Sequence, residues 1–230
     1  MQNVFNLLNQ DYYLNYPLIH ALEHGAELIA ADENGVAIYR YRPDFLLLSG
    51  PNPLALVNDL PGPDLIFLCG SQSARAVAAH FGLEEDYECY QLYYPHQTIE
   101  SDLPLEPITL KDLDFVLEHY HRLEPEEVEQ AIQEERIFGL RDNNKLFAFI
   151  GLHEDHAMGM LHILPEYRRQ GWGERLERAL TAKVLAMGEL PYGQVFTGNA
   201  ASMRLQEKLG FVQCSDKVYW MWKSESTPGN

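Results

Sequence analysis

The residues best placed for chemistry follow Ile163, where Leu164-Pro165-Glu166-Tyr167 leads into Arg168-Arg169-Gln170-Gly171-Trp172-Gly173. An apolar strand end runs here through Arg-x-x-Gly-x-Gly into a helical pattern. Glycines let the main chain approach a ligand closely, and the first turn of a helix presents unpaired N–H groups at its positive end. We call residues 168–173 the anion cradle, because this pattern predicts a binding site for an anion such as a diphosphate.

The segment after the cradle has apolar residues at helical spacing, which predicts a helix with one buried face. These residues are Leu176, Ala179, Leu180, Val184 and Met187. The solvent-exposed face is expected to hold Glu174, Arg175, Glu177, Arg178 and Lys183. No Gly-Lys-Ser/Thr follows, so the cradle is not a P-loop, and the third glycine of a dinucleotide site is missing. Alone, the two glycines fit an ordinary strand-to-helix connection equally well.

The downstream sequence supports a more specific interpretation. A strand is expected at 195–199, a helix at 200–209 and another strand after Leu209-Gly210-Phe211-Val212. Over roughly residues 105–223, the order Ile-x-Pro-x-x-Arg-x-x-Gly-x-Gly, then Asn-x-x-Ser, then Gly-Phe, resembles the GNAT superfamily of acyl-CoA-dependent N-acyltransferases. The resemblance implies an α/β (α+β) fold with a mixed, mostly antiparallel central sheet flanked by helices.

The chain is expected to contain two domains, with a boundary near residue 102 in the proline-rich stretch 95–107. Residues 103–230 would be the catalytic GNAT acyltransferase domain, and residues 1–102 a smaller, degenerate GNAT-like N-terminal domain. In that first half, strand-like runs at 26–31, 36–41 and 45–49 precede a buried-type strand at 64–70 and a helix at 71–81.

A shift of 128 residues places Phe81-Gly82-Leu83 on Leu209-Gly210-Phe211. This alignment favours a repeat, although two independent helix–strand units would give the same pattern. The first half has no Arg-x-x-Gly-x-Gly, and Pro51 and Pro53 remove N–H donors that a phosphate site needs. The tandem arrangement is similar to that of glycine-N-acyltransferase-like proteins.

The resemblance implies acetyl-CoA (acyl-CoA) as co-substrate and direct attack of an amine on the thioester in a ternary complex. The strand before the cradle would contact the pantetheine arm through its main chain, with the N–H of Ile163 as the best candidate to stabilise the oxyanion. Asn199 matches the family's Asn near the pantetheine, and it also suits a helix N-cap. The residues expected to bind the co-substrate are Leu161, Ile163, Leu164, Arg168, Arg169, Gln170, Gly171, Trp172, Gly173, Asn199 and Ser202.

Proton transfer is less well defined, because two family positions hold unsuitable residues. The His or Glu that many members carry on the fourth strand falls on Ala157 and Gly159, and a Tyr that many carry falls on Gln206. The available substitutes are Tyr219, His156 and His162, although each also fits a structural role in the core. We take these three as candidate catalytic residues.

Composition excludes several other classes of protein. The net charge of −17 disfavours nucleic acid as a partner, and 14 of the 34 acidic residues but only 3 of the 17 basic ones lie in residues 1–102. Three widely spaced cysteines suggest neither disulfides nor zinc, and His153 and His156 are expected in a hairpin turn, so no metal site is predicted. No membrane span or signal segment is visible, which favours a cytoplasmic location without membrane contact.

The first functional hypothesis is therefore an N-acetyltransferase that acts on the amine of a small molecule or amino acid. The alternatives are a protein or peptide N-acetyltransferase and a non-catalytic acyl-CoA-binding regulatory protein. A homodimer is possible, and nothing in the sequence identifies the acceptor.

Overall fold

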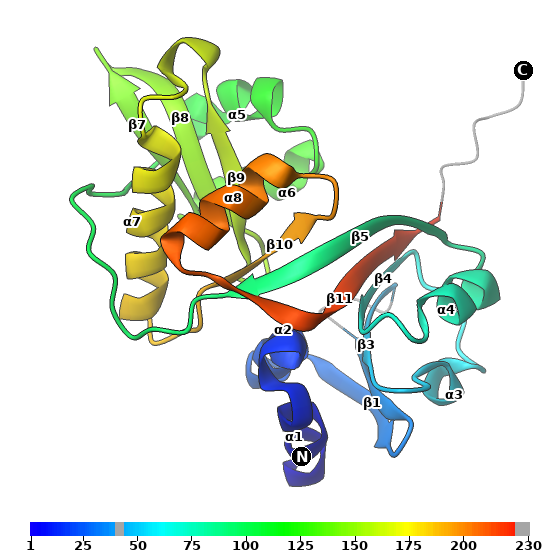
Figure 1. Cartoon of the computed structure of the whole chain (residues 1–230). Coiled ribbons are helices and arrows are strands. Elements are labelled where there is room, and N and C mark those ends of the chain that lie inside the picture. Colours follow the sequence, from blue (N-terminus) through cyan, green and yellow to red (C-terminus); the bar gives the residue numbers. More distant parts are fainter. Residues whose placement is uncertain (40–43, 224–230) are drawn as a thin grey trace, which may run out of the picture. The chain divides into compact units, whose positions relative to one another are not determined.

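The computed structural model describes residues 1–39 and 44–223, and the chain divides into two compact units (Figure 1). The first unit consists of Met1–Gln91, Val195–Asn199 and Gln213–Asn230, and the second of Leu92–Gln194 and Ala200–Val212. Among the described residues, no helix has the length and apolar character needed to cross a bilayer.

The first unit is built on a mostly antiparallel sheet in the order β1-β2-β3-β4-β11-β5-β10. Of β10 only the end belongs to this unit, and the end of β5 and the first residue of β11 belong to the second unit. The strands β3 and β4 run parallel, and their near-continuous apolar sequences are buried. The elements are α1 (Gln2–Leu8), η1 (Asn9–Asp11), α2 (Tyr12–Glu23), β1 (Glu27–Asp32), β2 (Gly35–Tyr39), β3 (Phe45–Ser49), α3 (Leu54–Val57), β4 (Leu65–Cys69), α4 (Ala74–Phe81), β5 (Glu84–Tyr93), β10 (Tyr192–Phe196) and β11 (Val212–Trp222).

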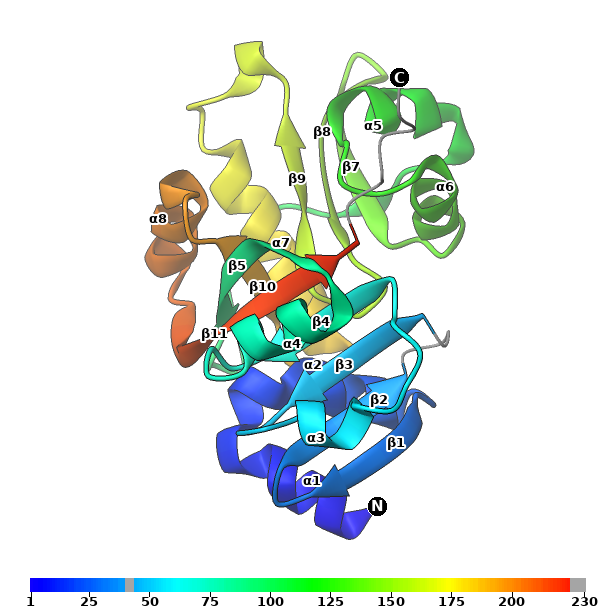
Figure 2. The same cartoon turned by 90° about the vertical axis from the view of Figure 1, so that its right-hand side faces the viewer.

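Helices cover both faces of this sheet (Figure 2). On one face α3 and α4 pack their apolar residues, among them Val57 and Val77, against β3 and β4. On the other, Asn15 of α2 accepts a hydrogen bond from Ser49 Oγ of β3 at 2.6 Å and donates one to Leu8 O at 2.9 Å. The expected strand at 36–41 corresponds to β2, and residues 40 and 41 lie outside the described residues.

The division into units differs from the expected boundary near residue 102 in two ways. The first unit's initial segment ends at Gln91, and the C-terminal strand belongs with it. The reason is the antiparallel pairing of β11 with β4, in which Val218 lies opposite Cys69 and Trp222 opposite Leu65. Pairing between strands so far apart in the chain cannot be recognised from composition, which is what the expected boundary rested on.

The second unit has a four-stranded antiparallel sheet in the order β6-β7-β8-β9. Its longest strand, β8, is almost wholly apolar because both of its faces are covered. The elements are β6 (Glu106–Pro107), η2 (Leu110–Asp112), α5 (Leu113–His119), α6 (Pro125–Gln133), β7 (Ile137–Asp142), β8 (Lys145–Leu152), β9 (Met158–Ile163), η3 (Pro165–Tyr167), α7 (Trp172–Ala186) and α8 (Ala200–Leu209), with the first part of β10.

Helices lie on the two faces of this second sheet (Figure 2). Val116 of α5 and Val128 of α6 pack with Phe149 and Met160 on one face. On the opposite face α7 approaches β9, because the side chains of Leu161 and Ile163 lie next to its first turn. The sheet therefore separates the helical segment 113–133 from the cradle helix.

Several expected elements are confirmed and some have different bounds. The helix at 200–209 and the strand that leads into the cradle are found, the latter as β9. Helix α6 ends at Gln133, since Glu135 adopts a left-handed φ of 55° and Ile137 starts β7. The strand expected at 195–199 is β10, which ends at Phe196, and Asn199 N–H turns back to Phe196 O.

The helix ends related by the shift of 128 have the same local geometry. Gly82 and Gly210 both adopt a left-handed φ, 64° and 90°. The amide of Leu83 donates to Ala78 O at 2.9 Å, and that of Phe211 donates to Gln206 O at 3.0 Å. A repeat would produce this match, although glycine-ended helices of unrelated origin often form the same cap.

Candidate acyl-CoA site

The strand before the cradle, β9, is the outermost strand of its sheet and carries a bulge. Gly159 and His162 on β9 lie opposite Gly151 and Phe149 on β8, so β9 holds one residue more than β8 across this stretch. Met160, within the bulge, has a left-handed φ of 55°. Bulges redirect side chains and occur often beside active sites.

The main-chain groups of β9 face two ways. The amide of Leu164 donates to Phe147 O on β8 at 2.9 Å. Because neighbouring residues of a strand alternate in direction, the N–H of Ile163 points to the outer edge. Ile163 therefore has the orientation expected of an oxyanion donor, whereas the N–H of Leu164, one of the predicted contributors to pantetheine binding, is already engaged with β8.

The cradle itself is a turn that leaves its N–H groups uncommitted. Arg169 and Gly171 adopt left-handed φ values of 60° and 84°, and α7 begins at Trp172. The first amide of this helix with a partner is that of Arg175, which donates to Gly171 O at 3.1 Å. Among the described residues, none accepts a hydrogen bond from the amides of 169–173. These are the donors that an anion at a helix N-terminus would use.

The two cradle glycines have different surroundings. A Cβ built on Gly171 meets nothing within 4 Å, so this residue borders open space. A Cβ on Gly173 would instead contact the side chains of Ile163, Leu161 and Leu205 at 3.6 to 3.8 Å. Gly171 therefore lies at the mouth of the cradle, and Gly173 faces β9 and α8.

Aromatic packing holds the cradle on the sheet. Phe147 of β8 stacks on Tyr167, with ring centroids 4.2 Å apart, and meets Trp172 edge-on at 5.4 Å. Arg168 donates from Nε to Ile163 O at 2.8 Å, which fixes the turn to the end of β9. The side chains of Arg169 and Gln170 are exposed. The turn is thus anchored by Phe147 and Arg168 while its amides stay accessible.

Of the candidate catalytic residues, His162 lies beside the predicted oxyanion donor, on the face of the sheet opposite α7. Its ring stacks on Phe149 at 5.5 Å and lies 4.6 Å from that of His119. Burial, His119 and Arg168 lower the pKa of His162 to about 4. The ring is therefore uncharged at neutral pH, and a base with so low a pKa removes a proton from an ammonium only weakly.

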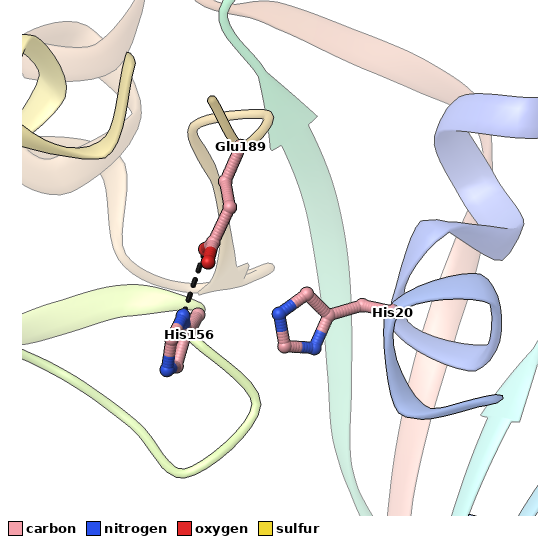
Figure 3. Close-up of side chains that lie close together, drawn as sticks. All are labelled: His20, His156 and Glu189. Atoms are coloured by element: carbon pink, nitrogen blue, oxygen red, sulfur yellow. Dashed lines mark hydrogen bonds and ion pairs between the residues drawn. The ribbon is translucent and has the colours of Figure 1, made fainter. Parts of the chain in front are cut away.

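His156 lies in the tight turn between β8 and β9, as the hairpin prediction required. Its amide donates to His153 O at 2.9 Å, and its own φ is 62°. The ring Nδ1 lies 2.7 Å from Glu189 Oε2 (Figure 3). This contact ties the hairpin to the segment after α7, so His156 has a structural explanation.

Tyr219 belongs to the first unit, where it lies on β11 opposite Leu68. Its hydroxyl donates to Glu88 Oε2 at 3.1 Å, and Glu88 also pairs with Lys217. If Tyr219 protonates the leaving thiolate, Tyr219→Phe will lower turnover and leave acyl-CoA affinity unchanged, as steady-state kinetics with calorimetry would measure. Unchanged turnover would remove Tyr219 from the mechanism.

The two predicted residues around the next helix fall on different sides of the division into units. Asn199 ends a segment of the first unit and immediately precedes α8. Ser202 lies in the first turn of α8, in the second unit, and is half-buried. Their assignment to the pantetheine arm stays a prediction.

One titratable residue was assigned to the wrong environment. Glu177 was expected on the solvent-exposed face of α7, but only 5% of it is exposed. Its Oε1 accepts a hydrogen bond from Gln206 Nε2 of α8 at 3.0 Å. Spacing alone misplaced it, because α7 is covered both by the sheet and by α8, which widens its buried face beyond one stripe.

Comparison with known proteins agrees with this geometry. Residues 137–221 match the family model described as FR47-like protein. A search of curated proteins gave no match. A solved Drosophila protein is similar with a TM-score of 0.65 and 15% identity, over 82% of this chain and 74% of that one.

Two solved GNAT structures align over nearly the whole chain. A putative acetyltransferase of the GNAT family from Novosphingobium aromaticivorans has a TM-score of 0.57 and 20% identity, over 91% of this chain and 97% of that one. A GCN5-related N-acetyltransferase from Kribbella flavida has a TM-score of 0.57 and 12% identity, over 95% and 96%. The likeness to these structures shows that the chain has the GNAT fold.

Proposed function

We propose that this protein is an N-acetyltransferase that transfers an acetyl group from acetyl-CoA to the amine of a small molecule or amino acid. The observation that carries the proposal is the run of uncommitted amides at 169–173, placed at the start of α7 directly after the outer strand β9. A diphosphate needs several convergent N–H donors and benefits from the helix dipole. The GNAT fold supports acyltransferase activity of this kind.

In this proposal, the chain's own groups bind the co-substrate and stabilise the transition state. The amides of residues 169–173 hold the diphosphate, and the exposed Arg169 adds positive charge beside it. The outward N–H of Ile163 polarises the thioester carbonyl and stabilises the oxyanion. Acetyl-CoA supplies the activated acyl group, and the amine attacks the carbonyl carbon directly. Among the described residues, the three cysteines are buried and form no disulfide, as the cytoplasmic location we propose would require.

We also propose that residues 1–102 form a degenerate GNAT-like domain. Its support is the matching helix end at Gly82 and Gly210 and the similar order of strand, helix and strand around α4 and α8. This domain would have lost the equivalent of the anion cradle, because Pro51 and Pro53 stand where N–H donors would be needed.

Calorimetry with acetyl-CoA and a thiol-release assay with a panel of amines, amino acids and peptides test the proposed function. Binding together with amine-dependent release of CoA is the expected result. Release with peptides only would move the protein to the peptide acetyltransferases, and binding without release would make it an acyl-CoA-binding protein. Absence of binding would refute the assignment of the cradle.

A further inference from the structure

Glu177 lies on α7 between two residues that approach β9, Gly173 and Thr181. One turn before it, Gly173 borders the side chains of Leu161 and Ile163. One turn after it, Thr181 Oγ1 lies 4.0 Å from Met158 Sδ. Residues four apart on a helix share a face, so Glu177 faces the middle of β9, between these two ends.

The surroundings of Glu177 leave half of its carboxyl group without a partner. Oε1 accepts the bond from Gln206, whereas Oε2 is buried and, among the described residues, makes no hydrogen bond. A carboxylate with a bare oxygen in such a place is unfavourable, and a neutral acid is tolerated far better. A protonated carboxyl group keeps one O–H donor available, and Gln206 fixes the orientation of the group.

Aminolysis of a thioester needs a proton at one particular atom. The amine nitrogen forms the new C–N bond, the C–S bond breaks and the sulfur leaves with the electron pair. The thiolate then takes up one proton, while the nitrogen loses one. A donor for the sulfur has to lie along β9 beyond the diphosphate, because the pantetheine arm extends from the cradle along the outer edge of this strand in the proposed function.

We propose that Glu177, oriented by Gln206, is the acid that donates this proton to the leaving sulfur. The inference rests on the proposed function and deepens it, since it assigns a residue to a step that the proposal requires. Glu177 Oε2 gives up its proton as the C–S bond breaks. The proton lost by the amine nitrogen returns to the carboxylate through solvent, so the protons balance over one turnover.

The ionisation of Glu177 sets the expected pH dependence. Burial raises the pKa of its carboxyl group from 4.5 to about 7, and the bond from Gln206 opposes part of this shift. No charged side chain of the described residues contributes to the shift. The group of α8 that contacts the carboxyl group is the neutral amide of Gln206, and the one titratable residue of β9, His162, packs against Phe149 on the other face of the sheet. Turnover should therefore fall as the pH rises above 7.

Glu177→Gln tests the role, because glutamine keeps the shape and the bond to Gln206 but carries no acidic proton. We expect kcat to fall by about 100-fold at pH 7 and the alkaline fall of kcat to disappear, with KM for acetyl-CoA and calorimetric affinity unchanged. Glu207→Gln, which makes the same charge change at an exposed neighbour of Gln206, should leave kcat and its pH profile as in the wild type.

The outcomes separate this proposal from the one on which it rests. If the wild type binds acetyl-CoA and turns over, an unchanged kcat and pH profile in Glu177→Gln would overturn the role of Glu177. The proposed transferase activity would then still stand. A wild type without acetyl-CoA binding would overturn both. Infrared difference spectra of the wild type against Glu177→Gln provide a readout independent of activity. A protonated carboxyl band lost in the variant supports the proposal, and its absence from the wild type at pH 6 overturns it.

Discussion

Gly171→Asp is expected to bind acetyl-CoA about 100-fold more weakly than Gly171→Asn. Asn and Asp tolerate the left-handed conformation that Gly171 adopts, at a φ of 84°, and they are nearly equal in size. The two variants therefore differ by one charge at the mouth of the cradle. At an effective permittivity of 20, a carboxylate about 5 Å from a phosphate charge costs about 3 kcal/mol, which corresponds to roughly a 100-fold change in affinity.

The matched control lies at the other end of the same helix. Gly188 also has a left-handed φ, 79°, and a Cβ there meets nothing within 4 Å. Gly188→Asp and Gly188→Asn repeat the charge change after the C-terminus of α7, and we expect the two to bind acetyl-CoA equally. Isothermal titration calorimetry measures all four variants. Equal affinities of Gly171→Asp and Gly171→Asn would mean that no anion sits at 169–173.

The cradle could be predicted from sequence because its determinants are local. Glycine at 171, where the chain needs a left-handed residue, and an apolar run on each side specify strand, turn and helix without reference to the rest of the chain. The same holds for the helix at 200–209, which ends at the left-handed Gly210. Nearest-neighbour preferences determine both features.

Features that depend on distant contacts were not predicted. The bulge in β9 is created by its register with β8, and no residue type marks it, since Met160 is an unusual choice for a left-handed φ. The placement of the C-terminal strand with the first unit depends on pairing with β4. A linear boundary near residue 102 cannot represent a unit assembled from three separate segments of the chain.

Glu177 shows why a binary pattern can miss a functional candidate. Its neighbours Glu174 and Arg178 form a half-buried ion pair, so the sequence of the helix is charged throughout this stretch. Glu177 is distinguished only by the approach of Gln206 from α8, which is a tertiary contact. The residues that were predicted as catalytic were recognised by type and by the resemblance, and the structure gives two of them, His156 and Tyr219, hydrogen-bonding partners.

The second large effect concerns stability, where Glu177→Gln is expected to make the protein more stable by about 3 kcal/mol above pH 7 and to have little effect below pH 4.5. Burial holds the pKa of the folded carboxyl group at about 7, against 4.5 for an ordinary glutamate. Between these values the unfolded chain releases a proton that the folded chain retains, so rising pH favours the unfolded chain. Glutamine does not titrate, and the variant escapes this loss. Denaturant unfolding on both sides of the pH window measures the difference, and hydrogen exchange of the α7 amides reports the second unit alone.

Glu207→Gln is the control for this stability measurement as well, since an exposed carboxylate should give no such gain. A Glu177→Gln variant less stable than the wild type at pH 8 would mean that the carboxylate is ionised and favourably paired in the folded protein. The expected signs are opposite for the two properties of one residue: the variant gains stability at high pH and loses turnover. If glutamine at position 177 makes the protein more stable, folding does not explain the glutamate found there. Its role must then lie elsewhere. The combination of a stability gain with an unchanged kcat would remove the catalytic role.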